Sequence, residues 1–574
     1  MAMMLTQLPV EIILQITGYL DNKSLINLYE LSRRVYYALT PRLREIYRVK
    51  SVDLGSIKKS QGVDVQPHLA ERRTLKFVEV LIFDGYCDDH REWNRCFLHA
   101  GKHADDLGRA LMPLFRGLKR HGLVTFKWYL ETCIPHQILG SRGYLRRHQR
   151  NIKHLVLKTR RCSEYTDPGD RLSISRFHNL RTFSWTGIST INHYIALTDF
   201  FAANASRLDE LTIDVDSFPR LLAKWRDLQK DWMKARNFFA FKVLQLQKGN
   251  TESLFPRLRK LSVRGIGFQY AHTEMAYAFQ LHKLHALRLD SAHILRTIAE
   301  IADNKTIPII SLIIKADEQR CPLEPQFFAL SMPNVKDVFI RIVAPDQTSL
   351  TPHLRSIFAP GRQIRRFVYH RHLYVAGDTA SEWDPTVAPM VWDTGVVNLL
   401  GNANLQCVGL CDHLPSLVRH TMSLTEAVDS TSPKTPPMTW EILHIRHLPT
   451  VHEEYHPHNP TFDLAYNFDA PFNPPPASLV NLTPYRSEFT TAEMTEFLAF
   501  ANWAFGPNGL SSLELLMFGR VKTVHWVQAL ERSIFLTRNM DLATRVKYPY
   551  RQVEAGDERI RTRFDANFDF LTAG

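Results

Sequence analysis

The sequence lacks several features that would place it in a specialised class of protein. Its seven cysteines are odd in number and scattered, which argues against the disulfide framework of a small secreted protein, so we expect reduced thiols. No apolar run is long enough to cross a bilayer, and the first residues lack the cationic start of a signal peptide. These absences favour a protein of the cytoplasm, the nucleus or both, with no membrane partner.

Positive charge is in excess but is not concentrated in the sequence. The formal net charge of +13 would suit an acidic partner, yet no long Lys/Arg block forms the arm that is typical of nucleic-acid binding. We therefore do not expect nucleic acid as a partner. Hydrophobic residues at 45% and charged residues at 22% are typical of folded protein, and 574 residues exceed one compact globule. Several domains or one extended array are expected.

The first 50 residues predict three short amphipathic helices. Pro9 fits the first turn of a helix, and Ile12 and Ile16 then follow at four-residue spacing. Ser32 is placed to cap a third helix, which we expect to end before Pro41. A bundle of about 40 residues buries little surface, so it is expected to need a partner to complete its core.

This stretch resembles the F-box, in the form found in fungal proteins. The resemblance rests on Leu-Pro-x-Glu-Ile-Ile-x-x-Ile-x-x-x-Leu, then Ser-Leu-x-x-Leu, then Ser-Arg-Arg-Val-Tyr-x-x-Leu. It implies binding to the small adaptor subunit of a cullin-based (SCF-type) ubiquitin ligase. The positions that match the family's Leu-Pro pair and apolar positions, shared between the adaptor interface and the motif's own core, are Leu8, Pro9, Ile12, Ile16, Leu20, Leu25 and Leu28. A plain helical cap on the rest of the chain is the alternative.

A six-residue unit, apolar-x-x-apolar-x-apolar, recurs along the chain. Eight copies begin at 28, 28, 50, 26, 25, 26 and 29-residue intervals, which match one strand-plus-helix coil, or two, of a leucine-rich repeat. Five weaker copies, which start at residues 77, 123, 405, 440 and 510, precede and follow them. The eight clear copies start at residues 152, 180, 208, 258, 284, 309, 335 and 364. We therefore predict an α/β fold in which an irregular leucine-rich-repeat solenoid, with parallel strands inside and helices outside, follows the N-terminal helices.

The pattern divides the chain into five predicted parts. They are an F-box at 1–50, a connecting segment with weak first repeats at 51–150, the solenoid at 151–420, Pro-rich loops around one strand at 421–487, and a terminal repeat with a C-terminal cap at 488–574. Within the solenoid, residues 219–247 predict a longer amphipathic helix. That helix is either the outer helix of a lengthened repeat or a helix that binds a partner.

The residue after each strand unit is expected to point from the inner wall of the solenoid into solvent. Five of ten such residues are Lys or Arg, where the chain average of 71 in 574 predicts about one. Exposed positions are generally richer in charge than the average, so this excess is a modest indication. The interpretation is either a surface for an acidic or phosphorylated protein segment or an ordinary solvated face. The five basic candidates for substrate binding are Lys158, Arg264, Lys315, Arg341 and Arg446.

Catalytic and metal-binding motifs are poorly supported, so we expect no enzyme activity, metal or cofactor. His452-Glu453-Glu454-Tyr455-His456 has the spacing of a zinc protease, but flanking prolines leave no room for the required helix. Cys407 and Cys411 have no second pair to complete a zinc site. Arg264-Gly265-Ile266-Gly267 lacks the third glycine of a dinucleotide loop and is better read as a turn.

The sequence thus predicts a substrate-recognition subunit of a ubiquitin ligase, with the F-box binding the adaptor and the solenoid binding a protein substrate. Its contribution would be proximity between the target and the transfer machinery. The alternative function is a leucine-rich-repeat interaction scaffold that is not associated with a ubiquitin ligase. A third hypothesis, nucleic-acid binding by the basic solenoid, predicts an affinity that falls steeply with added salt.

Overall fold

The computed structural model describes most of the chain, which divides into two compact units, Met1–Leu284 and His285–Gly574. Each unit is described by itself. The described residues are 8–29, 32–56, 73–86, 101–159, 172–215, 237–249, 251–266, 271–289, 297–298, 300–301, 306–317, 332–344, 351–359, 362–373, 399–400, 403–411, 439–446, 491–507, 509–519, 533–539, 548–554 and 556–571.

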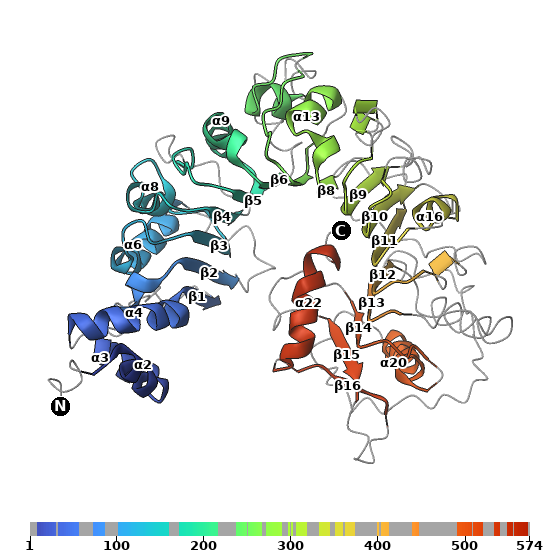
Figure 1. The fold of residues 1–574 in the computed structure, drawn as a ribbon. Coiled ribbons are helices and arrows are strands. Elements are labelled where there is room, and N and C mark those ends of the chain that lie inside the picture. The colour runs from blue at the N-terminus through green and yellow to red at the C-terminus, as the bar shows by residue number, and fades with distance from the viewer. Residues whose placement is uncertain are drawn as a thin grey trace. The chain divides into compact units, whose positions relative to one another are not determined.

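The first unit begins with three helices, α2 (Val10–Gly18), α3 (Asn22–Tyr29) and α4 (Arg33–Tyr47), which we call the N-terminal helices (Figure 1). The hydroxyl of Ser32 accepts a hydrogen bond from the Val35 N–H at 3.2 Å, so the predicted cap of the third helix is present.

Helix α4 does not end before Pro41 as the sequence predicted, but continues to Tyr47. Pro41 lacks an N–H and so cannot bond to a carbonyl in the preceding turn. The hydroxyl of Thr40 donates to the Tyr36 carbonyl at 2.7 Å, which adds a bond to this turn. Leu43 beyond the proline is buried in the core of the three helices, and this burial favours continuation of the helix.

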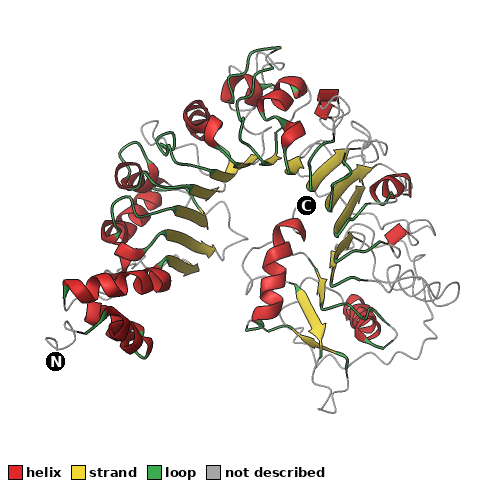
Figure 2. Ribbon diagram, in the orientation of Figure 1, coloured by secondary structure: helices red, strands yellow, loops and turns green. Residues whose placement is uncertain are grey.

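Beyond these helices, the described residues of the first unit form seven strands that pair in chain order, all of them parallel. Helices lie on one side of these strands (Figure 2). The strands are β1 (Val49–Ser56), β2 (Val80–Tyr86), β3 (Thr125–Glu131), β4 (His154–Thr159), β5 (Thr182–Ile188), β6 (Glu210–Val215) and β7 (Lys260–Arg264). The helical segments are η1 (Leu75–Phe77), α6 (Gly101–Gly117), α7 (His136–Leu139), α8 (Tyr144–His148), α9 (Ile191–Asn204), η4 (Ala205–Arg207), η5 (Phe239–Val243, a π-helix), α13 (His272–Ala278) and η6 (Leu281–Lys283).

Alternation along the strands places the core of the first unit on their helix-covered side. Every second residue is buried in β4 and β6, and in β5 as far as Trp185; the register aligns Leu157, Trp185 and Ile213 across the three strands. The helices complete this core, since Phe200 of α9 lies 4.1 Å from Phe183 between ring centroids. The opposite side of the strands carries the polar residues.

The second unit contains nine described strands, also in chain order. The strands from β8 to β14 pair in parallel, whereas β15 and β16 continue the sheet antiparallel. The strands are β8 (Ala286–Leu289), β9 (Ser311–Asp317), β10 (Asp337–Ala344), β11 (Arg366–Leu373), β12 (Cys407–Cys411), β13 (Ile442–Arg446), β14 (Leu515–Phe518), β15 (Ile534–Arg538) and β16 (Tyr550–Gln552). The helices are α16 (Thr351–Ile357), α20 (Thr491–Phe505) and α22 (Glu558–Leu571).

The fold is thus mixed α/β with a mostly parallel sheet in each unit, which is compatible with a solenoid-like arrangement. Each of the thirteen six-residue units overlaps a strand from β2 to β14. The antiparallel ending is a departure from the expected parallel array. Of the amphipathic helix predicted at 219–247, only the end is described, as the π-helix η5. Most of the Pro-rich segment also lies outside the described residues.

One expectation about the cysteines is wrong, because Cys133 is disulfide-bonded. Scattered spacing in the sequence does not reveal which thiols meet in the fold. Cys407 is a free, buried thiol. Where the structure is described, no helix combines the length and apolarity that crossing a membrane requires.

Candidate docking surfaces

The N-terminal helices share a small core of their own. Ile13, Leu25, Val35 and Leu39 are almost fully buried, and they pack together with Leu28 in one cluster. The cluster extends to the rest of the unit through Tyr29, whose ring centroid lies 5.2 Å from that of Phe77 in η1. Lys76 of η1 also lies over the Tyr29 ring, so in the described residues η1 is a contact between the bundle and the rest of the unit.

Large exposed apolar side chains gather on α2, at the residue that follows it, and on α4. Seven of the nine such residues in the described chain lie between residues 10 and 37, although this stretch is a small part of the whole. Ile12 and Ile16 on α2 are 39% and 36% exposed, and Tyr37 on α4 is 72% exposed. The seven residues are Val10, Ile12, Leu14, Ile16, Tyr19, Tyr36 and Tyr37, and we call them the apolar patch. Exposed apolar residues at this density are typical of an interaction surface.

The structure separates the seven predicted adaptor-binding residues into surface and core positions. Pro9, Ile12 and Ile16 are exposed. Leu8 and Leu20 are partly buried against the bundle's core. The remaining two, Leu25 and Leu28, are buried within that core. Three of the seven are therefore open to a partner.

A second candidate surface is the polar side of the strands in the first unit. Lys158 and Arg264, two of the predicted substrate-binding residues, lie here in one register row with Thr186 and Asp214. Arg264 is paired with Asp214 at 3.4 Å, and Lys260 pairs with Glu210 at 2.7 Å. These ion pairs balance the charge, so the described face of β6 and β7 is not the free basic surface that the sequence suggested.

The corresponding side of the strands in the second unit is covered. Helix α22 lies against it, while α20 lies on the other side (Figure 1). Ile560 and Phe564 of α22 share a buried cluster with residues of six strands, β10 to β15, and with one residue that follows β16. The other members are Phe339, Val368, Cys407, Ile442, Leu515, Met517, Phe535 and Val553. Nothing in the sequence pattern predicts that helix α22 occupies this face.

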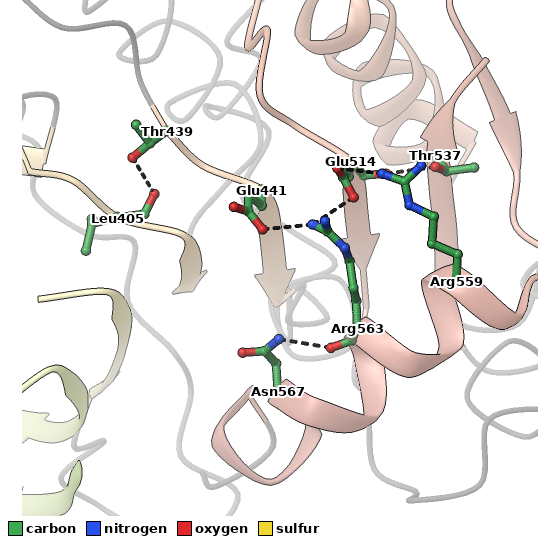
Figure 3. A network of polar contacts seen from close by, with 8 residues as sticks. All are labelled: Leu405, Thr439, Glu441, Glu514, Thr537, Arg559, Arg563 and Asn567. Carbon is green, nitrogen blue, oxygen red and sulfur yellow. Dashed lines mark hydrogen bonds and ion pairs between the residues drawn. The ribbon is translucent and has the colours of Figure 1, made fainter. Parts of the chain in front are cut away.

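Ion pairs accompany this apolar contact (Figure 3). The guanidinium of Arg563 lies 2.8 Å from the Glu441 carboxylate and 2.7 Å from that of Glu514, and Arg559 lies 2.9 Å from Glu514. The hydroxyl of Thr537 donates to the backbone carbonyl of Glu514 at 2.8 Å. Two carboxylates beside the strands thus form ion pairs with two arginines of α22. These pairs hold the helix over β13, β14 and β15.

The remaining predicted substrate residues lie on the strands of the second unit. Arg341 on β10 is half-buried and is aligned with Lys315 of β9 in the register. The side chains of Lys315 and Arg446 are outside the described part. His370 follows the six-residue unit that starts at residue 364, so it was expected to point into solvent. It is instead buried, with its ring centroid 5.0 Å from that of Phe339. This face of the strands in the second unit is therefore largely apolar where α22 covers it.

The described residues provide no support for the catalytic and metal-binding motifs considered in the sequence. The His452–His456 segment lies outside the described residues, and within those described no group of three or more His, Cys, Asp or Glu could hold a metal ion. Burial raises the pKa of the Cys407 thiol to about 12. Gly265 has a φ of +69°, and a Cβ there would lie 2.2 Å from the Val215 carbonyl oxygen, so this glycine belongs to a tight turn.

Comparison with known proteins adds no assignment: no protein-family model matches the chain, and no curated protein matches it. The candidate surfaces therefore rest on the residues and geometry described above.

Proposed function

We propose that the protein is the substrate-recognition subunit of an SCF-type ubiquitin ligase. In this proposal the N-terminal helices are an F-box that binds the ligase's small adaptor subunit, and the strands behind them form an irregular leucine-rich-repeat solenoid that binds a protein substrate. The chain itself performs no chemistry and acts by holding the substrate near the transfer machinery.

The observation that supports this proposal best is the apolar patch. Helix α2 has apolar residues on two sides. Ile13 is buried in the core of the bundle, whereas Ile12 and Ile16 are exposed and have no described partner. Burial of an apolar side chain contributes roughly 1.5 to 3 kcal/mol, so covering several of them suits a stable protein–protein contact. The F-box resemblance in the same residues names the kind of partner.

Co-purification tests the proposal against the repeat-scaffold alternative. The full-length protein, expressed in cells, should retain the adaptor and a cullin, and Leu8→Ala combined with Pro9→Ala should reduce this recovery. A scaffold that never joins a ligase would recover neither protein. Since Leu8 packs against the bundle core, the thermal unfolding of the double variant must be compared with that of the unaltered chain.

A further inference from the structure

The turns that precede β3, β4, β5, β6 and β7 carry a high density of positive charge. They comprise residues 117–124, 141–153, 174–181, 205–209 and 251–259, and we call them the basic edge. These turns contain twelve Lys or Arg residues and two acidic ones. The twelve are Lys119, Arg120, Arg142, Arg146, Arg147, Arg150, Lys153, Arg176, Arg181, Arg207, Arg257 and Arg259.

The parallel sheet brings these turns together at one edge. Because the strands start at the same side, the residues before them form a ladder: the Lys153 N–H donates to the Val124 carbonyl, and the Arg181 N–H donates to the Lys153 carbonyl, each at 2.8 Å. Side chains also join neighbouring turns, since Asn151 donates to the His121 carbonyl at 3.0 Å. Charges that the repeat separates by nearly 30 residues in sequence become neighbours, which is why the sequence shows no basic block.

Most of this charge is not neutralised within the edge. Arg257 pairs with Asp209 at 3.5 Å. In contrast, Arg147, Arg150 and Arg176 are exposed and form no ion pair with any carboxylate in the described residues. The pKa of Arg146 is lowered by burial and further by repulsion from Arg176 and Arg147, which reflects the same accumulation of positive charge.

The charge density favours a duplex as the partner. Strands lie about 4.8 Å apart, so five turns extend over about 20 Å, and a net ten positive charges give about one per 2 Å. Double-stranded DNA carries about one negative charge per 1.7 Å, whereas a fully acidic extended peptide carries at most about one per 3.3 Å. Arginine predominates, and its guanidinium fork matches phosphate geometry.

The basic edge also lacks the groups that other partners require. None of the large exposed hydrophobic residues of the described chain lies in these turns. Single strands bind by stacking bases on aromatic side chains, and protein partners usually insert apolar anchors into pockets. We infer that the basic edge binds the phosphate backbone of double-stranded nucleic acid without reading its sequence. This inference does not depend on the proposed ligase function.

The test uses the full-length protein and a 20-base-pair DNA duplex of arbitrary sequence, with binding followed by fluorescence anisotropy. If about six phosphates are neutralised, affinity should fall roughly a thousandfold between 50 and 200 mM salt. The variant Arg147→Glu, Arg150→Glu, Arg176→Glu should bind at least about tenfold more weakly, with a salt slope shallower by about three.

A charge-matched variant separates a defined surface from net charge. Arg33→Glu, Arg34→Glu, Arg44→Glu makes the same change in net charge at exposed positions of the N-terminal helices, and it should bind within about threefold of the unaltered protein because salt screens charges outside the edge. Equal losses in both variants would overturn the inference. So would tighter binding of a single strand of the same length, or displacement of the duplex by an acidic peptide at equal charge concentration.

Discussion

Arg563 of α22 lies 2.7 Å from Glu514, the residue that directly precedes β14, and 2.8 Å from Glu441 directly before β13. One guanidinium therefore connects the C-terminal helix to two neighbouring strands of the second unit. Together with the buried contacts of Ile560 and Phe564, this makes α22 the occupant of a sheet face that a substrate would otherwise meet. Substrate binding to the second unit must involve other surfaces or displacement of this helix.

The ion pairs of Arg563 are expected to stabilise the docked helix modestly. Because its side chain is about one-third exposed, solvent screens the attraction, and Arg563→Met should lower the stability of the second unit by about 1 kcal/mol. Arg561→Met is the matched control, since Arg561 is exposed and its ion pair with Glu558, at 3.4 Å, lies within its own helix. Hydrogen exchange of the α22 amides measures both, and equal effects would contradict the assigned role of Arg563.

Apolar burial should contribute more to this docking than the ion pairs. Phe564 is fully buried, and its ring lies 5.4 Å from that of Phe535, so Phe564→Ala should cost about 3 to 5 kcal/mol. Thr562→Ala on the exposed side of the same helix should cost less than about 1 kcal/mol. Denaturant unfolding gives the two values, and a small loss for Phe564→Ala would show that α22 is not held by the cluster.

Two glycines with similar backbone angles should differ in their tolerance of a side chain. Gly265 and Gly249 have φ values of +69° and +76°. A Cβ at Gly265 meets the Val215 carbonyl oxygen at 2.2 Å, whereas a Cβ at Gly249 meets nothing within 4 Å. Gly249→Ala should therefore cost about 1 kcal/mol from backbone strain, and Gly265→Ala should cost clearly more. Thermal unfolding of both variants would contradict this prediction if their losses were equal.

The buried His193 should make the first unit sensitive to acid. Burial lowers its pKa to about 3, so the folded chain keeps this imidazole neutral while the unfolded chain binds a proton below about pH 6.5. Its contribution is complete above pH 6.5 and is lost as the pH falls from 6.5 toward 3, by up to about 1.4 kcal/mol per pH unit.

Fluorescence of Trp185, whose ring centroid lies 4.8 Å from that of His193, can report this effect. The pH dependence of urea unfolding should become shallower in His193→Phe. His178→Phe, at an exposed histidine of the same unit, should keep the slope of the unaltered protein. An unchanged slope in His193→Phe would assign the acid sensitivity to other groups.

The strands could be predicted because their signal is local. A unit such as Leu180 to Trp185 puts its apolar residues on the buried side of β5, and repetition at a regular interval indicated parallel neighbours. The three N-terminal helices were predicted for the same reason. The local sequence does not determine whether an apolar residue of a helix faces the core or the solvent. Ile13 is buried and Ile12 is exposed because the other helices pack against the side of α2 that carries Ile13.

Features that depend on distant contacts were missed. The segment from Glu558 to Leu571 reads as an ordinary amphipathic helix, and nothing near it in sequence indicates that it docks on strands more than 100 residues earlier. The charge of the polar sheet face was misjudged likewise, because Arg264 was counted without its partner Asp214, 50 residues away. The basic edge was hidden because folding, not sequence, makes its members neighbours.

The central claim is that the apolar patch binds the adaptor, and one measurement tests it most directly. Binding of purified adaptor to the full-length protein is measured by calorimetry for the unaltered chain, for Ile12→Asp with Ile16→Asp, and for Ile310→Asp. Ile310, in the second unit, is 39% exposed, as is Ile12, so the control makes the same chemical change at equal exposure. We predict that the double variant loses at least about a hundredfold in affinity, as expected for central interface residues, while Ile310→Asp binds normally. Undiminished binding by the double variant, or no binding by the unaltered protein, would contradict the account.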